Sequence, residues 1–246
     1  MAQNIYDDPT FFEAYSKFRR STLGLDGAAE WPALRSLLPP MTGLRVADLG
    51  CGYGWFCRWA ADAGAKSVVG LDVSQKMLTK AKAETSGQTV RYVRTDLGEL
   101  DLPAGEFDLA YSSLAFHYVE DFERLVAAVH RALGPAGQLV FSIEHPIYMA
   151  PDRPGWATLG DGRKVWPLDS YQREGARSTN WMVDGVIKYH RTLGTTLNAL
   201  IRRGFAIRHV EEWKPTPAQI AAFPAAREEM DRPMFLLVAA DRIGGL

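Results

Sequence analysis

The segment that most constrains this chain is residues 46–55, which read VADLGCGYGW. A short apolar run ends in an acid, a glycine-rich turn follows, and an amphipathic segment comes next. This order predicts a strand, a ligand-binding loop and a helix. Glycine lets the backbone turn tightly and brings its N–H groups close to a ligand, at the positive end of the following helix. The segment therefore predicts an α/β fold with a nucleotide-like cofactor at the loop.

The spacing of the glycines separates two kinds of cofactor. A dinucleotide loop reads G-x-G-x-x-G, and its third glycine lets the helix pack closely on the strand. Here the glycines fall at positions 50, 52 and 54, and Trp55 occupies the place of that third glycine. Asp48, two residues before the loop, would lie near a bound diphosphate and repel it. These features disfavour NAD and favour a ligand that carries positive charge near the loop.

Two further acids follow the next two predicted strands. Residues 67–71 lead directly into Asp72, and the β-branched run at residues 89–93 ends shortly before Asp96. The carboxyl ends of parallel strands meet at one edge of a sheet, where an acid typically takes a ribose diol. Three successive strands thus each bring a carboxylate to the same edge.

Four ordered motifs resemble those of class I S-adenosylmethionine-dependent methyltransferases. The closest likeness is to the small-molecule group, methyltransferase type 11, which includes quinone- and biotin-biosynthesis enzymes. The motifs are DLGCGYG at 48–54, GLD at 70–72, TDL at 95–97 and FDLAYSS at 107–113. The likeness is strong over residues 43–145 and weaker over residues 204–240. It implies S-adenosylmethionine as cofactor, S-adenosylhomocysteine as product, and in-line methyl transfer to a small-molecule acceptor.

The resemblance also assigns residues to parts of the cofactor. It implies that the loop glycines hold the methionine part, that Asp72 holds the ribose hydroxyls, and that Asp96 with the Leu97 backbone holds the adenine. An N-terminal helix that begins at Asp8 is expected to lie across the cofactor mouth, with Arg20 pairing the cofactor carboxylate. The predicted cofactor-binding residues are Asp48, Gly50, Cys51, Gly52, Gly54, Asp72, Val73, Met77, Asp96, Leu97, Ser112, Tyr15 and Arg20.

The catalytic prediction rests on what methyl transfer requires. The enzyme must align the nucleophile and exclude water, and proximity can supply about 7–11 kcal/mol. A base is needed only where the acceptor loses a proton, and histidine has the suitable pKa. We predict His117 and His145 as proton acceptors and Glu144 as an orienting carboxylate. The acceptor atom can be oxygen, nitrogen or carbon.

Aromatic and cationic side chains further along the chain are predicted to contact the substrate. They are Tyr118, Tyr148, Trp166, Tyr171, His190 and Arg191. The aromatic rings would form an apolar wall, and Arg191 would anchor an anionic group; packing of the inserted segment on the core explains the rings equally well. Two other functions stay open: a cofactor-binding regulatory protein without turnover, and a nicotinamide-dependent oxidoreductase, which Asp48 and Trp55 disfavour.

Composition excludes several classes of partner. The net charge is −1 and the pI is about 6.5, so no broad positive field attracts nucleic acid or an anionic membrane. No run approaches the about 18 apolar residues of a membrane span, and the first residues lack a signal-peptide pattern. The scattered histidines and the two cysteines suggest no metal site. We expect a cytoplasmic protein, monomer or homodimer, with no nucleic-acid or membrane partner.

We predict a Rossmann-like, doubly wound sheet of seven mostly parallel strands, the last antiparallel, in one methyltransferase domain. Its parts are a helical cap at 1–42, a cofactor-binding core at 43–145, a substrate lid at 146–191 and the rest of the core at 192–246. Within the lid, residues 163–168 are expected to pair with residues 183–189 as a hairpin. The helix predicted at 121–133 is expected to stop at a Gly-Pro pair, with the next strand at 138–143.

Overall fold

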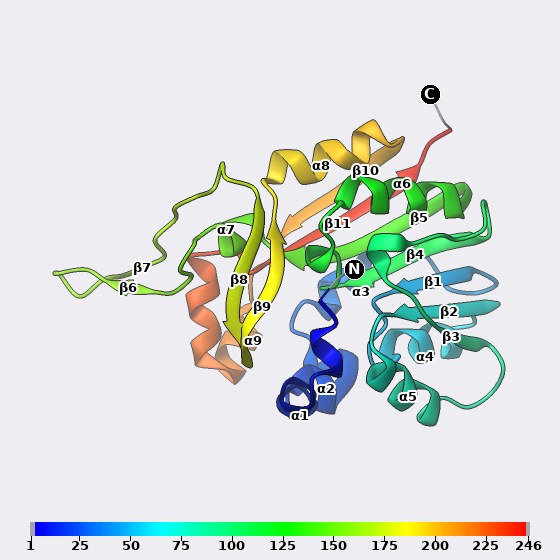
Figure 1. Cartoon of the computed structure of the whole chain (residues 1–246), viewed down its shortest axis with the longest axis horizontal. Coiled ribbons are helices and arrows are strands. Elements are labelled where there is room, and N and C mark those ends of the chain that lie inside the picture. The colour runs from blue at the N-terminus through cyan, green and yellow to red at the C-terminus, as the bar shows by residue number, and fades with distance from the viewer. Residues whose placement is uncertain (1–2, 245–246) are drawn as a thin grey trace.

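The computed structural model describes residues 3–244, and a seven-stranded sheet forms its centre (Figure 1). The strand order is β10-β11-β5-β4-β1-β2-β3. Strand β11 runs antiparallel to both neighbours, and the other pairs in this sheet are parallel. The strands are β1 (Arg45–Leu49), β2 (Ser67–Asp72), β3 (Val90–Arg94), β4 (Phe107–Ser113), β5 (Leu133–Glu144), β10 (Phe205–Glu212) and β11 (Phe235–Arg242). The Rossmann-like sheet predicted from the sequence is confirmed.

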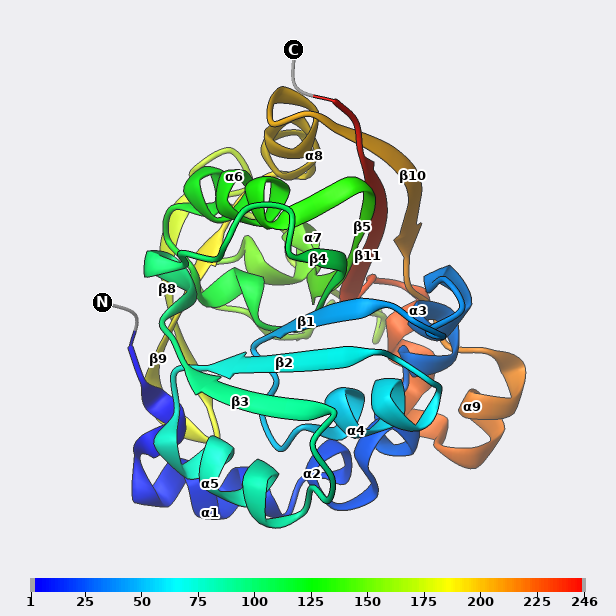
Figure 2. The same cartoon turned by 90° about the vertical axis from the view of Figure 1, so that its right-hand side faces the viewer.

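Helices cover both faces of the sheet, as Figure 2 shows. On one face lie α3 (Trp31–Leu37), α4 (Trp55–Asp62) and α5 (Gln75–Ala83), and on the other lie α6 (Phe122–Ala132) and α8 (Leu193–Arg202). Each face of the sheet has its own hydrophobic core, and neighbouring residues of one strand belong to different cores. Val46 lies in the core with α3 and α4, and Ala47 lies in the core with α6 and α8. Because both faces are buried, the inner strands read as continuous apolar runs. No helix within residues 3–244 is long and apolar enough to cross a membrane.

The order of the strands creates a crevice at one edge of the sheet. The chain moves outward from β1 to β2 and β3, then returns to place β4 on the other side of β1. At such a reversal the connections leave in opposite directions, and ligands bind outside the carboxyl ends of the strands. Asp48 on β1 pairs with Gly70 of β2 and Tyr111 of β4, so the glycine loop leaves β1 at this reversal.

The N-terminal cap and the inserted segment surround this edge. Asp8 caps α1 (Pro9–Ser16) by accepting from the Phe11 backbone N–H, as its sequence predicts. A short helix α2 (Arg19–Leu23) follows. The carboxylate of Asp7 fixes the cap to the core, because it accepts from the Ser74 hydroxyl at 2.6 Å and from the Lys76 N–H at 3.0 Å. Figure 1 shows the cap and the inserted hairpin beyond the carboxyl ends of the strands.

The predicted pairing inside the insertion is wrong. Strand β9 (Val183–His190) pairs with β8 (Gly175–Trp181), while β7 (Lys164–Val165) pairs with β6 (Ala157–Thr158). A single residue, Met182 with φ of 63°, joins β8 to β9, so this hairpin closes a far shorter loop than the predicted one. β8 carries mostly polar residues, so its sequence gives little indication of a strand. A short helix α7 (Pro146–Met149) starts the insertion.

Two further features differ from the prediction. α6 ends at Ala132, but β5 starts at once with Leu133, and the Gly-Pro pair lies inside an irregular first part of the strand. There Phe107 pairs with Leu133 and Leu109 pairs with Gln138, so the intervening residues bulge out of the ladder. Between β10 and β11 the chain forms α9 (Pro217–Ala222) and the 3₁₀ helix Pro224–Met230, neither of which we predicted.

Candidate functional site

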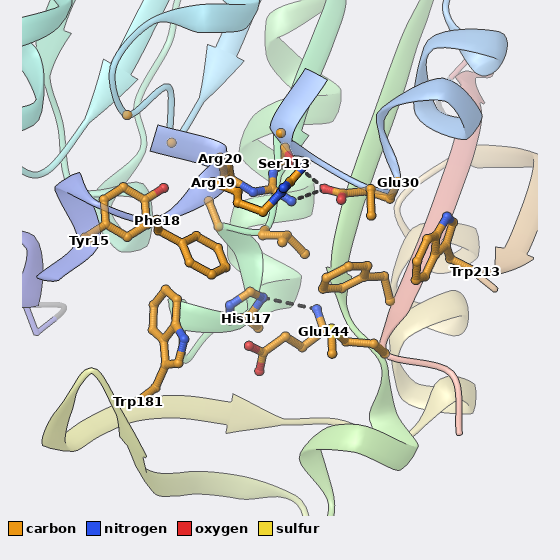
Figure 3. A pocket seen from close by; sticks show the side chains of 18 of the residues that line it. Tyr15, Phe18, Arg19, Arg20, Glu30, Ser113, His117, Glu144, Trp181 and Trp213 are labelled. Carbon is orange, nitrogen blue, oxygen red and sulfur yellow. Dashed lines mark hydrogen bonds and ion pairs between the residues drawn. The ribbon is translucent and has the colours of Figure 1, made fainter. Parts of the chain in front are cut away.

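A cavity of about 740 Å³ lies at the carboxyl edge of the sheet. It is lined by the cap, the glycine loop, the ends of β2, β4 and β5, the β8–β9 hairpin and the segment between β10 and β11. Figure 3 shows Tyr15, Phe18 and Trp181 on one side, Glu30 and Trp213 on the other, and His117 and Glu144 between them. A cavity of this size holds a ligand of several hundred daltons, since ligand pockets span roughly 300–1,000 Å³.

The three positions of the loop require glycine for different structural reasons. All three have left-handed φ values, 82° at Gly50, 52° at Gly52 and 72° at Gly54. A Cβ on Gly50 would lie 2.3 Å from the Ala115 Cβ, and one on Gly54 would lie 2.1 Å from the Tyr92 hydroxyl. A Cβ on Gly52 would have no atom of the described chain within 4 Å other than its chain neighbours, and Gly52 lines the cavity. The loop therefore leaves free space at Gly52, on the cavity side.

Asp72 joins this loop to the end of β2. Its Oδ2 accepts from the Gly52 N–H and its Oδ1 accepts from the Ser74 N–H, both at 2.9 Å. Burial raises the pKa of the Asp72 carboxyl above its usual value. Ser74 in turn caps α5 by accepting from the Met77 N–H. The other predicted cofactor residues that line this end are Gly50, Val73, Met77, Asp96 and Leu97.

Four predicted cofactor residues lie outside the cavity lining: Asp48, Cys51, Gly54 and Ser112. The Asp48 Oδ2 accepts from the Cys57 thiol at 3.1 Å, and its side chain is buried. The Ser112 hydroxyl donates to the Leu49 carbonyl at 2.7 Å. Side chains of successive strand residues point to opposite faces, so Ser112 turns from the cavity and Ser113 lines it. Asp48 and Ser112 therefore support the base of the loop.

Asp48 makes stability depend on pH. Burial raises its pKa from 3.8 to about 7, so the folded state holds a proton that the unfolded chain releases near ~3.9. The stability that Asp48 contributes is complete below about pH 4 and is lost as pH rises through about 7. Asp48→Asn cannot ionise, and its amide oxygen can still accept from Cys57. In urea unfolding without cofactor, the free energy of unfolding of Asp48→Asn relative to that of the wild type should rise by about 2–3 kcal/mol between about pH 5 and pH 8. A difference in the free energy of unfolding that is the same at both pH values would contradict this prediction.

The acceptor end of the cavity contains His117 and Glu144. His117 Nδ1 accepts from the Glu144 backbone N–H at 3.3 Å (Figure 3). Burial, and then the positive charges of Lys188 and Arg191, hold the pKa of His117 well below its usual range. The ring is therefore neutral near pH 7, and because Nδ1 accepts, Nε2 carries the proton. Tyr118 and Tyr148, both predicted substrate residues, line the same end.

Lys188 neutralises Glu144 beneath this end of the cavity. The Lys188 ammonium pairs with Glu144 Oε1, and Lys188 is 2% exposed. It also lies 4.9 Å from the centre of the Trp181 ring and 5.9 Å from that of Tyr118. These contacts position the Trp181 and Tyr118 rings next to the Glu144 carboxylate.

The structure separates His145 and Trp166 from this group. His145 Nε2 lies 2.9 Å from Glu212 Oε1, and His145 Nδ1 accepts from the Ile147 N–H as the cap of α7. Trp166 donates to the Ile147 carbonyl and stacks on Tyr148. Neither side chain lines the cavity. We therefore leave both out of the proposed site.

The predicted substrate residues near the end of β9 have structural partners as well. His190 Nε2 lies 2.8 Å from the Tyr171 carbonyl, and the Tyr171 hydroxyl accepts from the Leu193 N–H. Arg191 donates to the Val119 and Glu120 carbonyls. All three side chains lie outside the large cavity and join the insertion to the core. Arg191 is thus engaged by backbone carbonyls, where we expected it to anchor a substrate.

Arg20 has a partner that the sequence did not suggest. It pairs with Glu30 and donates to the Ser113 hydroxyl at 2.9 Å, as Figure 3 shows. Glu30 is fully buried, although it directly precedes helix α3 and reads as a surface residue. No local pattern marks Glu30 as buried, because its burial depends on the packing of the cap on the sheet. Tyr15, which we predicted to bind the cofactor, lines the cavity.

Comparisons with known proteins agree with this fold. Residues 47–141 match the family described as "Methyltransferase domain". The crystal structure of an S-adenosylmethionine-dependent methyltransferase from Mesorhizobium loti is 63% identical, covers 89% of this chain and 100% of its own, and superposes with a TM-score of 0.86. A putative S-adenosylmethionine-dependent methyltransferase from Listeria monocytogenes is 38% identical, with coverages of 90% and 100% and a TM-score of 0.84.

A curated relative with a defined activity matches a smaller part. The malonyl-[acyl-carrier protein] O-methyltransferase of Pectobacterium atrosepticum is 32% identical over 148 residues, which are 60% of this chain and 51% of the relative. Taken with the fold and the glycine loop, these likenesses define a methyltransferase that uses a sulfonium cofactor. The chain belongs to the class I S-adenosylmethionine-dependent methyltransferases, and its cofactor is S-adenosylmethionine.

Proposed function

We propose that this enzyme transfers the methyl group of S-adenosylmethionine to a small-molecule acceptor held in the same cavity. One observation carries the proposal: a single cavity extends from Gly52 and Asp72 to His117 and Glu144. Its volume suits a cofactor and a small acceptor together. The net charge of −1 supports a small molecule over nucleic acid. The Pectobacterium relative is named for a malonyl-carrier substrate, but the match spans 51% of it, so we do not transfer that acceptor.

The residues at the loop end fit the cofactor. Gly52 leaves the space that a side chain would fill, and the Asp72 carboxylate lies directly beside it. We assign the methionine part to the loop, the ribose hydroxyls to Asp72, and the adenine to Asp96 and Leu97, with Val73 and Met77 along its face. When bound, the cofactor supplies a methyl group already activated by its sulfonium. The chain must then orient the acceptor and exclude water, which can supply about 7–11 kcal/mol.

The described residues suit those two tasks. Tyr15, Tyr118 and Trp181 place aromatic rings around the cavity, and the Tyr6 hydroxyl lies 3.3 Å from that of Tyr118. These rings displace water from the reacting centre. His117 is neutral and carries its proton on Nε2, so we assign it as a hydrogen-bond donor that orients the acceptor. This role replaces the proton acceptor expected from its sequence position, because the protein itself occupies Nδ1.

Binding and turnover together test the proposed function. Calorimetric titration should show that S-adenosylmethionine and S-adenosylhomocysteine bind and that NAD does not. Incubation with S-adenosylmethionine that carries a deuterated methyl group, in the presence of a metabolite extract, should yield a mass-shifted small molecule. Binding of NAD would favour an oxidoreductase. Cofactor binding without any labelled product would favour the regulatory protein.

The two histidines are expected to behave differently. His117→Asn keeps an acceptor for the Glu144 N–H but removes the donor at Nε2, so turnover should fall at least about tenfold. His145→Asn keeps an acceptor that can cap α7 at the Ile147 N–H but loses the contact with Glu212, so it should lower the melting temperature only slightly and leave turnover within about threefold. Labelled-methyl turnover and thermal unfolding of both variants check this. Equal losses of turnover would place His145 in the mechanism.

A further inference from the structure

Two carboxylates at the cavity each have one oxygen that is paired with a cation and one that is not. Glu144 Oε1 pairs with Lys188, and Glu30 Oε1 pairs with Arg20. The second oxygen of each, Oε2, has no hydrogen-bond partner within the described residues. Both glutamates line the cavity, and the side chains of Glu30 and Glu144 are 1% and 14% exposed. A buried carboxylate oxygen without a donor is costly, so a bound ligand that supplies an N–H or O–H is favoured there.

The cations near these glutamates are already engaged. Arg20 binds Glu30 and Ser113, and Lys188 is buried beneath Glu144. Within residues 3–244, the other guanidinium that lines the cavity belongs to Arg19, which is exposed at the rim. An anionic acceptor group beside Glu144 would therefore meet carboxylate oxygens and no free cation. Like charges brought together in a water-poor site disfavour binding strongly.

The contacts on the sheet edge connect the two glutamates. Ser113 on β4 and Ser142 on β5 are register partners, and their hydroxyls lie 3.5 Å apart. Ser113 also donates to Glu30 Oε1, and Glu144 ends β5 two residues after Ser142. The two carboxylates thus belong to one polar strip at the carboxyl ends of β4 and β5. His117 bonds to the backbone of this strip at Glu144.

Beyond this strip, large apolar side chains form one wall of the cavity. Side chains from the segment between β10 and β11, from the hairpin and from the cap form this wall: Phe18, Trp181, Trp213, Phe223, Met234 and Phe235. Phe18 and Phe223 are 45% and 64% exposed, so the wall extends to the mouth of the cavity. Exposed aromatic rings that rim a cavity favour a ligand with an apolar body.

We propose that the acceptor is an apolar molecule whose reacting group is an uncharged amine or hydroxyl, that Glu144 Oε2 binds its N–H or O–H, and that the Arg20–Glu30 pair excludes carboxylate acceptors. The inference rests on the proposed function. The lone pair of the acceptor forms the new bond to the methyl carbon, and the S–CH₃ bond breaks with its electrons remaining on sulfur. The proton of the acceptor goes to Glu144, which begins the step as a carboxylate.

The test compares three probes of similar shape that differ in the head group. Titrated into the S-adenosylhomocysteine-loaded enzyme, 4-propylphenol and 4-propylaniline should bind at least about tenfold more tightly than 4-propylbenzoate. Glu144→Gln should weaken the phenol and the aniline by at least about tenfold. Glu30→Gln frees Arg20 and should strengthen benzoate binding about tenfold, a gain that loss of folding cannot mimic.

Glu123→Gln on the surface of α6, where Glu123 pairs with Arg202 and Arg203, is the matched control and should leave the probe ratio unchanged. Benzoate binding as tight as phenol binding in the wild type, or no probe binding to the loaded enzyme, would overturn the inference. So would a labelled methyl ester as the product from the metabolite extract. Each of these results would leave the proposed methyltransferase function intact. That function fails only if S-adenosylmethionine is not bound or no methyl group is transferred.

Discussion

Asp72→Asn is expected to weaken S-adenosylmethionine binding about 100-fold, which corresponds to 2–3 kcal/mol at 1.4 kcal/mol per factor of ten. The carboxylate now accepts from the Gly52 and Ser74 N–H groups with one oxygen each. An asparagine has one accepting oxygen, so its NH₂ group must face either a backbone N–H or the ribose hydroxyls. Hydrogen bonds to charged groups contribute roughly 1.5–3 kcal/mol, so the loss is large.

Calorimetric titration of the variant with S-adenosylmethionine and S-adenosylhomocysteine measures this effect. Asp62→Asn, on the exposed surface of α4, is the matched control and should bind like the wild type. Thermal unfolding without ligand separates binding from folding. In the empty protein the asparagine NH₂ group replaces one of the two accepting oxygens, so we expect a moderate fall in melting temperature beside the large loss of affinity. A dissociation constant within about threefold of the wild type would exclude Asp72 from the cofactor site.

Gly52→Ala should fold and yet lose cofactor binding by more than about 100-fold. The φ of 52° costs an alanine about 1–2 kcal/mol of stability. Apart from its chain neighbours, no atom of residues 3–244 lies within 4 Å of the added methyl group, so it would occupy the space that we assign to the ligand. The expected signature is a moderate fall in melting temperature with a large loss of affinity.

Gly87→Ala is a control for the backbone cost. Gly87 lies on the exposed turn after α5, has a φ of 83°, and also leaves open space where a Cβ would be. The two variants should lose similar stability, and Gly87→Ala should keep wild-type affinity for S-adenosylmethionine. Equal affinities of the two variants would mean that the cofactor does not contact the loop at Gly52.

Local sequence patterns predicted most of the sheet because their causes are local. Val46 and Ala47 belong to an apolar run that only a strand buried on both faces explains. Asp8 and Thr192 are residues that cap helices, and both accept from backbone N–H groups at the start of the helices that follow them. The glycine loop with its following helix is equally local. These signals lie within a few residues of the structure that they specify.

Other features escaped prediction because they depend on contacts between distant residues. β8 carries few apolar residues, and its pairing with β9 follows from a one-residue turn at Met182. Glu30 precedes a helix and is buried by a partner on the cap, Arg20, and by Ser113 on β4. His145 is chemically as suited to catalysis as His117, but its ring turns toward Glu212.

The amino-acid sequence by itself determined the order of the strands and helices of the central sheet, the glycine loop, and the acids at the carboxyl ends of β1 and β2. It did so because hydrophobic periodicity, capping and turn chemistry act between near neighbours. Only the tertiary structure decided which histidine reaches the cavity, which cations are free, and where Glu30 and Glu144 lie. Those outcomes depend on which side of a strand end faces the cavity and on which distant residue is available as a partner. Local sequence patterns specify neither.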